Sequence, residues 1–130
     1  MTTQVTAAQI AKLRRMVDEP LTTTYSDALL TTMIEDHPLI DELGSVPYTW
    51  SIATDPPTKV ETPDWIATYD LNITAAEIWD EKAAALAELF SFSADGGNLQ
   101  VSDKYSHALS MAAHFRSRRA IRTHNVIRKD

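Results

Sequence analysis

The side chains in this sequence that could take part in catalysis or metal binding are histidines and carboxylates. His107 and His114 stand seven residues apart in a segment predicted to be helical. Histidine pairs that bind zinc from a single helix are spaced by three or four residues, so that both imidazoles reach one ion. These two would lie two turns apart, and we expect them to be surface or interface histidines. The sequence contains no cysteine, which excludes disulfides and thiolate metal sites.

Several carboxylates fall in a second predicted helix and could be combined into an acid–base pair. They are Glu77, Asp80, Glu81 and Glu88. A solvated helix face explains them more simply than a catalytic pair does. The sequence has no glycine-rich phosphate loop, nucleophile elbow or EF-hand loop. It therefore predicts a protein that is not an enzyme and that needs neither a metal nor a cofactor.

The basic residues are gathered at the C-terminal end of an otherwise acidic chain. From Lys104 to Asp130 there are seven Lys or Arg against one acid, a net charge of +6, whereas the preceding 103 residues have five against 17, a net charge of −12. This asymmetry predicts an electrostatic partner, which could be an acidic protein surface, a neighbouring copy of the chain, or nucleic acid. The candidate partner-binding residues are Arg116, Arg119, Arg122, Arg128 and Lys129.

The element that must position these groups is a central helix from Asp70 to Phe90. Its apolar residues recur at spacings of three and four, and it contains neither proline nor glycine. A helix of about 21 residues would be roughly 30 Å long. Its many alanines favour helix and let neighbouring helices approach closely. We expect the rest of the chain to pack around it.

Three further helices complete a mainly α fold, a small bundle of about four helices. Thr6 and Gln9 form a capping-box pattern at the start of a helix over residues 7–19, and Ser26 caps a second that ends near Pro38. The last helix is expected to begin at Ser102 and Asp103, with a short β-hairpin before it over residues 90–101. Residues 123–130 are expected to form a basic tail.

A long irregular segment from Gly44 to Tyr69 interrupts the helices with four prolines. Tyr48, Trp50 and Ile52 alternate with smaller or polar residues, which predicts a short strand with one buried face. The part that contains Trp65 could return as a second strand or lie across the helices. So much aromatic surface needs cover, so we expect Tyr48, Trp50 and Trp65 to contact a neighbouring subunit and other chains to order this segment.

The length of 130 residues suits one domain over residues 1–130. The N-terminus lacks the pattern of a secretory signal, and no apolar run reaches the 18 or so residues of a membrane span. We expect a protein that is made in the cytoplasm and has no membrane partner.

Three parts of the sequence together resemble a known family. They are TYSDALL at the start of the second helix, the alanine-rich helix with Trp79 and Lys82, and the aromatic-Ser-Ala-Asp-Gly-Gly turn that leads to Tyr105 and the arginines. Over residues 10–122 the chain resembles small head-to-tail connector proteins of tailed bacteriophages, also called adaptor or head-completion proteins. The resemblance implies a helical virion protein of the neck, made in the host cytoplasm, with no catalytic residues.

The resemblance also implies the partners. Members of this family form an oligomeric ring, usually a dodecamer, between the portal of a DNA-filled head and the tail or stopper proteins, and DNA passes along its channel. The alternative is a small DNA-binding protein of phage packaging or regulation. A helix-turn-helix reader needs two helices around a turn of three or four residues. The wider separation of the last two predicted helices and the acidic body favour assembly.

Overall fold

The computed structural model describes residues 5–92 and 99–120, and in these ranges it contains four helices and one two-stranded antiparallel sheet. The helices and strands are α1 (Ala7–Val17), α2 (Asp27–Glu35), β1 (Tyr48–Ser51), β2 (Thr58–Glu61), α3 (Leu71–Phe92) and α4 (Leu99–Ser117). The predicted mainly α architecture is confirmed.

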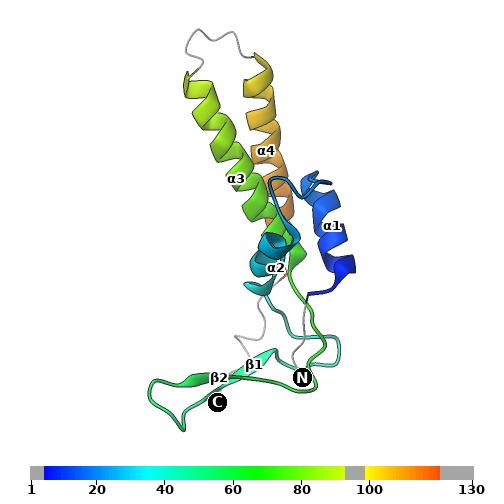
Figure 1. The fold of residues 1–130 in the computed structure, drawn as a ribbon, viewed down its shortest axis with the longest axis vertical. Helices are drawn as coiled ribbons and strands as arrows, with labels where there is room; N and C mark the ends of the chain where they lie inside the picture. Colours follow the sequence, from blue (N-terminus) through cyan, green and yellow to red (C-terminus); the bar gives the residue numbers. More distant parts are fainter. Residues whose placement is uncertain (1–4, 93–98, 121–130) are drawn as a thin grey trace.

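The two longest helices, α3 and α4, lie side by side along the length of the molecule (Figure 1). The predicted β-hairpin over residues 90–101 is wrong, because α3 continues through Phe92 and α4 already begins at Leu99. Ser102 and Asp103 therefore lie inside α4 and do not cap it. The apolar alternation that suggested strands over residues 90–101 covers only a few residues. The helices α3 and α4 both extend into this range. The Asp-Gly-Gly turn lies outside the described residues.

The core forms where α1 and α2 pack against α3, and α3 packs against α4. Small side chains are buried on both helices of the α3–α4 pair, namely Ala75 and Ala83 of α3 and Ala108 and Ala112 of α4. The larger core side chains are Leu13, Val17, Leu30, Ile34, Ile78 and Trp79. Alanines at these positions let two helices approach closely while the larger residues fill the space beside them.

Local capping sets the start of both short helices as predicted. Thr6 and Gln9 form the complete capping box of α1, and the Ser26 side chain accepts the N–H of Leu29 at the start of α2. The end of α1 differs from the prediction: the helix stops at Val17 because Asp18 adopts a left-handed conformation with φ 56°. The helix therefore ends two residues before the predicted position.

Helix α3 caps the C-terminus of α1 with two side-chain donors. The Trp79 indole N–H donates to the carbonyl of Met16 at 3.1 Å, and the Lys82 ammonium donates to the carbonyl of Val17 at 2.7 Å. The last carbonyls of a helix lack intrahelical partners and carry partial negative charge, so a cation is stabilising there. These bonds fix α1 against the central helix.

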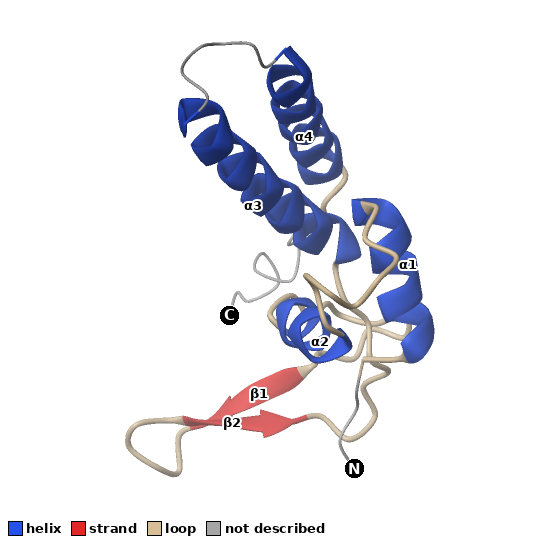
Figure 2. Cartoon of the chain, turned by 45° about the horizontal axis from the view of Figure 1, so that its top comes forward, coloured by secondary structure: helices blue, strands red, loops and turns tan. Residues whose placement is uncertain are grey.

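The strands β1 and β2 form a hairpin that projects from the end of the molecule opposite the Phe92 end of α3 (Figures 1 and 2). Tyr48 lies opposite Glu61, and Trp50 lies opposite Lys59. The β-hairpin of the described structure thus lies within the proline-rich segment, and not at the predicted position directly before α4.

Candidate functional site

One face of the hairpin carries two aromatic rings and two charged side chains. Alternation along the strands places Tyr48, Trp50, Lys59 and Glu61 on the same face. The Lys59 ammonium lies 4.3 Å from the centre of the Tyr48 ring and 5.9 Å from that of Trp50. The two rings are themselves packed edge to face at 5.8 Å. The strand prediction is confirmed, but its buried face is not, because Trp50 remains 58% exposed and Ile52 85% exposed.

The second tryptophan of the segment is used inside the chain. Trp65 is only 6% exposed, and its indole N–H donates to the carbonyl of Leu39 at 2.8 Å. Its ring also packs edge to face against Tyr69 at 5.5 Å. Its own chain therefore covers most of Trp65, and the predicted contact of Trp65 with a neighbouring subunit stays a prediction.

Asp41 holds together the two ends of the segment that carries the hairpin. Its buried carboxylate accepts the N–H of Ile66 at 2.8 Å, and also those of Ser45 at 2.8 Å and Leu43 at 3.0 Å. Hydrogen bonds from backbone N–H groups, above all that of Ile66, lower the pKa of Asp41. The base of the hairpin is therefore held by contacts within the chain, and the expectation that other chains order the segment stays a prediction.

Sequence reasoning missed Asp41, although a local signal was available. An aspartate followed closely by glycine and serine is typical of a turn in which the carboxylate accepts nearby backbone N–H groups. Gly44 adopts φ +87°, a conformation that side-chain-bearing residues rarely take. The bond to Ile66, by contrast, spans 25 residues and could not be read from the sequence.

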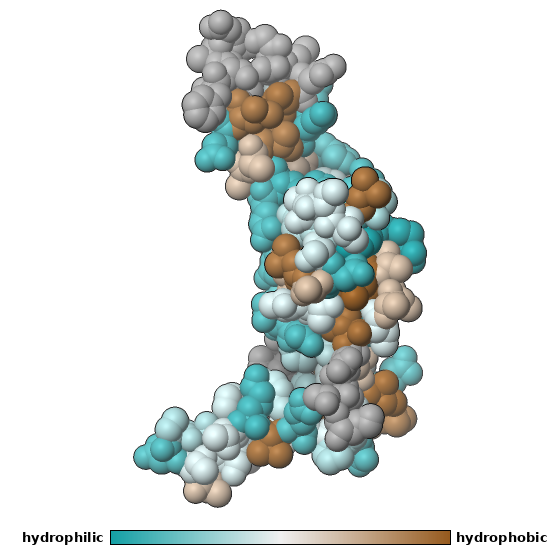
Figure 3. Space-filling view, viewed as in Figure 1, coloured by the Kyte–Doolittle hydropathy of each residue, from teal (hydrophilic) through white to brown (hydrophobic). Residues whose placement is uncertain are grey.

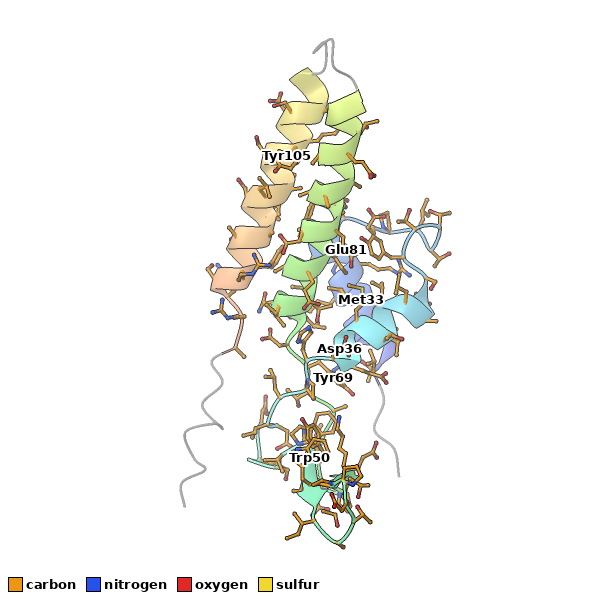
Figure 4. The ribbon with its side chains drawn as sticks, turned by 90° about the vertical axis from the view of Figure 1, so that its left-hand side faces the viewer. Met33, Asp36, Trp50, Tyr69, Glu81 and Tyr105 are labelled. Atoms are coloured by element: carbon orange, nitrogen blue, oxygen red, sulfur yellow. The ribbon has the colours of Figure 1, made fainter. Side chains whose placement is uncertain are left out.

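A small cavity of about 150 Å³ lies between the hairpin and the helices. We call it the acidic aromatic pocket, and it is lined by Glu35, Pro38, Pro47, Tyr48, Lys59, Glu61, Trp65 and Tyr69. Figure 4 shows Tyr69 at the junction of the hairpin and the helical body, with Trp50 on the hairpin. Burial raises the pKa of the Tyr69 hydroxyl, and the negative charges of Glu35 and Glu61 raise it further.

At the basic end, the structure brings Arg116 and Arg119 together on the last turn of α4 and just beyond it. The Arg116 guanidinium forms an ion pair with Asp80 of α3. Arg119 donates to the carbonyl of Arg116 at 2.9 Å and so caps the helix. Both predicted partner-binding arginines thus have contacts within the chain, while Arg122, Arg128 and Lys129 lie outside the described residues.

The end of α4 is tied to the start of α3 by a second carboxylate that the sequence analysis did not single out. Asp70 is 3% exposed; one oxygen accepts the N–H of Ile73 at 3.2 Å and the other accepts the N–H of Ala120 at 2.9 Å. Asp70 directly follows Tyr69 of the acidic aromatic pocket. Ala120, the last described residue, is therefore fixed near that pocket.

The acidic face of α3 is solvent-accessible as expected, since Asp80, Glu81 and Glu88 are exposed and Glu77 is half-buried, but three of these carboxylates also make contacts within the chain. Besides the Asp80 pair, Glu77 contacts the His37 ring at 3.1 Å, and Glu81 accepts the Tyr25 hydroxyl at 3.0 Å. Burial, followed by the bond to Glu81, raises the pKa of Tyr25. Asp80 thus links α3 to α4, and Glu77 and Glu81 link α3 to residues that flank α2. The described residues contain no group of three or more His, Asp or Glu able to hold a metal.

The two histidines of α4 are exposed, as predicted. His107 packs edge to face on Trp79 at 5.5 Å. It also lines an apolar groove of about 420 Å³ bounded by Asp18, Trp79, Lys82, Ala85, Leu86, Lys104, His107 and Ala108. Lys82, which lies in this groove, is already paired with Glu19 at 2.9 Å and stacked over Trp79 at 4.3 Å. Of the charged side chains that line the groove, Lys82 is therefore already engaged within the chain.

Among the described residues, no helix combines the length and the apolar content that crossing a membrane requires. No protein-family model matches the sequence, and comparisons with curated proteins and with solved structures give no match either.

Proposed function

We propose that this chain is a structural subunit of a tailed-phage neck, which assembles into an oligomeric ring between the portal of the DNA-filled head and the tail. The sequence resemblance suggests this role. The observation that carries it is the projecting hairpin with its exposed aromatic face. A two-stranded hairpin is at best marginally stable in water by itself, and exposed tryptophan beside tyrosine is typical of protein interfaces.

The distribution of exposed apolar side chains supports a contact surface at this end. Among the described residues nine large apolar side chains are exposed, and five of them fall between residues 43 and 66: Leu43, Trp50, Ile52, Val60 and Ile66. Single exposed apolar residues are normal, but a concentration in one projecting segment indicates a binding surface. Figure 3 shows a second group of apolar side chains near the end of the α3–α4 pair that lies away from the hairpin.

The DNA-binding alternative receives less support. A helix-turn-helix reader holds two helices at a wide angle around a short turn, whereas α3 and α4 pack along each other. Arg116, which could contact phosphate, is paired with Asp80. The acidic body of the chain would also repel DNA outside the basic end.

The direct test is the native mass of the purified protein, alone and mixed with the portal of the same virus. We expect a ring of many copies that binds the portal, and negative-stain images of it should show a central channel. The double variant Trp50→Ser/Ile52→Ser should keep its helicity, because both side chains are exposed, yet lose the ring. The matched control is Leu109→Ser, at an exposed position on α4.

A protein that remains monomeric at all concentrations, with and without portal, would contradict the proposal. Salt-dependent binding to DNA by that monomer would instead favour the DNA-binding alternative.

A further inference from the structure

The acidic aromatic pocket has the composition of a site for a positively charged side chain. Tyr48, Trp65 and Tyr69 supply aromatic rings, while Glu35 and Glu61 supply carboxylates. Aromatic faces attract lysine ammonium and arginine guanidinium groups through the ring quadrupole, and more strongly where water is excluded. Carboxylates add charge-assisted hydrogen bonds to the same ligand.

The charges at the pocket are not balanced within the chain. Neither Glu35 nor Glu61 forms an ion pair with another described residue. Lys59 is the one cation that lines the cavity, and it lies over Tyr48 and not on a carboxylate. The lining thus carries two negative charges against one positive charge, and the Lys59 ammonium already lies over one of its rings, that of Tyr48.

The chain itself supplies the complementary group. Its basic end carries three cations beyond the described residues: Arg122, Arg128 and Lys129. The first 103 residues, by contrast, have a net charge of −12, from five Lys or Arg against 17 acids. Residues 121–130 follow directly on Ala120, whose N–H donates to the carboxylate of Asp70, the residue next to Tyr69. Ten residues can span at most about 33–36 Å when extended, so the cations of this segment can lie well away from Ala120.

We propose that the acidic aromatic pocket of one copy binds an arginine or lysine side chain from residues 121–130 of a second copy. The inference rests on the proposed ring, in which a pocket on one subunit and a different patch on the next form a head-to-tail interface that can close. Contact between copies also covers Trp50, which adjoins the pocket through Tyr48 and is 58% exposed in the single chain. A contact within one chain would place no partner surface over this ring.

Photo-cross-linking identifies the occupant. The full chain carries p-benzoylphenylalanine in place of Tyr48, and unlabelled and ¹⁵N-labelled protein are mixed in equal amounts before assembly. We expect cross-links to residues 121–130 in which one peptide is labelled and the other is not. Cross-links within one label only would mean that the chain's own segment occupies the pocket, and cross-links to another segment would mean a different occupant. Either result overturns the inference.

The energetic test neutralises the pocket. The variant Glu35→Gln/Glu61→Gln should weaken subunit association by about tenfold or more, because the incoming cation loses both of its carboxylate partners. The matched control, Glu42→Gln/Glu88→Gln, removes the same charge from residues that are equally exposed but do not line the pocket, and it should leave association unchanged. Sedimentation velocity measures both, and the helix content checks folding.

These results separate the two proposals. If the pocket variant forms rings as tightly as the wild type, the pocket inference is wrong and the ring remains supported. If the wild type itself forms no ring, with or without portal, the proposed function fails.

Discussion

Replacing Trp65 by phenylalanine should loosen the base of the hairpin while the helices stay folded. The substitution keeps an aromatic ring but removes the indole N–H that donates to the carbonyl of Leu39 at 2.8 Å. A buried acceptor left without its partner costs about 1–3 kcal/mol. Leu39 is only half-buried, so water can replace part of the lost bond, and we expect about 1–2 kcal/mol.

This loss should be local, because Trp65 lies outside the helical core cluster. At about 1.4 kcal/mol for each factor of ten, the base of the hairpin would open about 5- to 30-fold more often. Hydrogen exchange of the Ile66 amide, which donates to Asp41, reports this opening. The amide of Ile78, in the buried centre of α3, should exchange at an unchanged rate.

The matched control is Trp50→Phe, which makes the same chemical change at a position that is 58% exposed. It should leave exchange at Ile66 unchanged. The reasoning is refuted if Trp65→Phe leaves exchange at Ile66 at the wild-type rate, or if both variants raise it equally. Either result would mean that the hairpin base does not depend on the Trp65 hydrogen bond.

Three other substitutions or conditions test the remaining contacts. Arg116→Ala and Asp80→Ala should each lower the free energy of unfolding by less than about 1 kcal/mol, since both side chains are over 40% exposed; a double-mutant cycle by urea unfolding measures their coupling. The pKa of Asp41 is lowered in the folded state, so the stability that its hydrogen bonds contribute is fully present above the unfolded pKa of 3.8. This contribution is lost as the pH falls through the folded pKa, and amide exchange at the hairpin base should accelerate in that pH range. Asp70→Ala should cost about 1–3 kcal/mol in thermal unfolding, and Asp70→Ser should recover the helix cap but not the bond to Ala120.

Signals that act within a few residues predicted the corresponding structure well. Thr6 with Gln9 and Ser26 with Leu29 form their bonds across three residues, so their geometry follows from local sequence. The central helix was predicted for the same reason, because apolar spacing and alanine content act along one segment. Its C-terminal end was predicted at Phe90 and lies at Phe92, because the short apolar alternation that follows Phe90 was interpreted as a strand.

The candidate site was predicted only in part. Alternation correctly put Tyr48 and Trp50 on one face, but the sequence offers two tryptophans and no means to tell which is buried. The decision depends on the carbonyl of Leu39, 26 residues before Trp65. The partner of Arg116 likewise lies 36 residues away in α3.

By itself the sequence determined the helical periodicity, the helix caps and the separation of an acidic body from a basic end, because each depends only on which residues follow one another. Tertiary structure decided that Trp65 is buried while Trp50 is open, that Arg116 pairs with Asp80, and that Glu35 and Glu61 meet around Tyr69. Those outcomes depend on how the segments between them cross the helices. That path is set by packing of the whole core, and no local pattern encodes it.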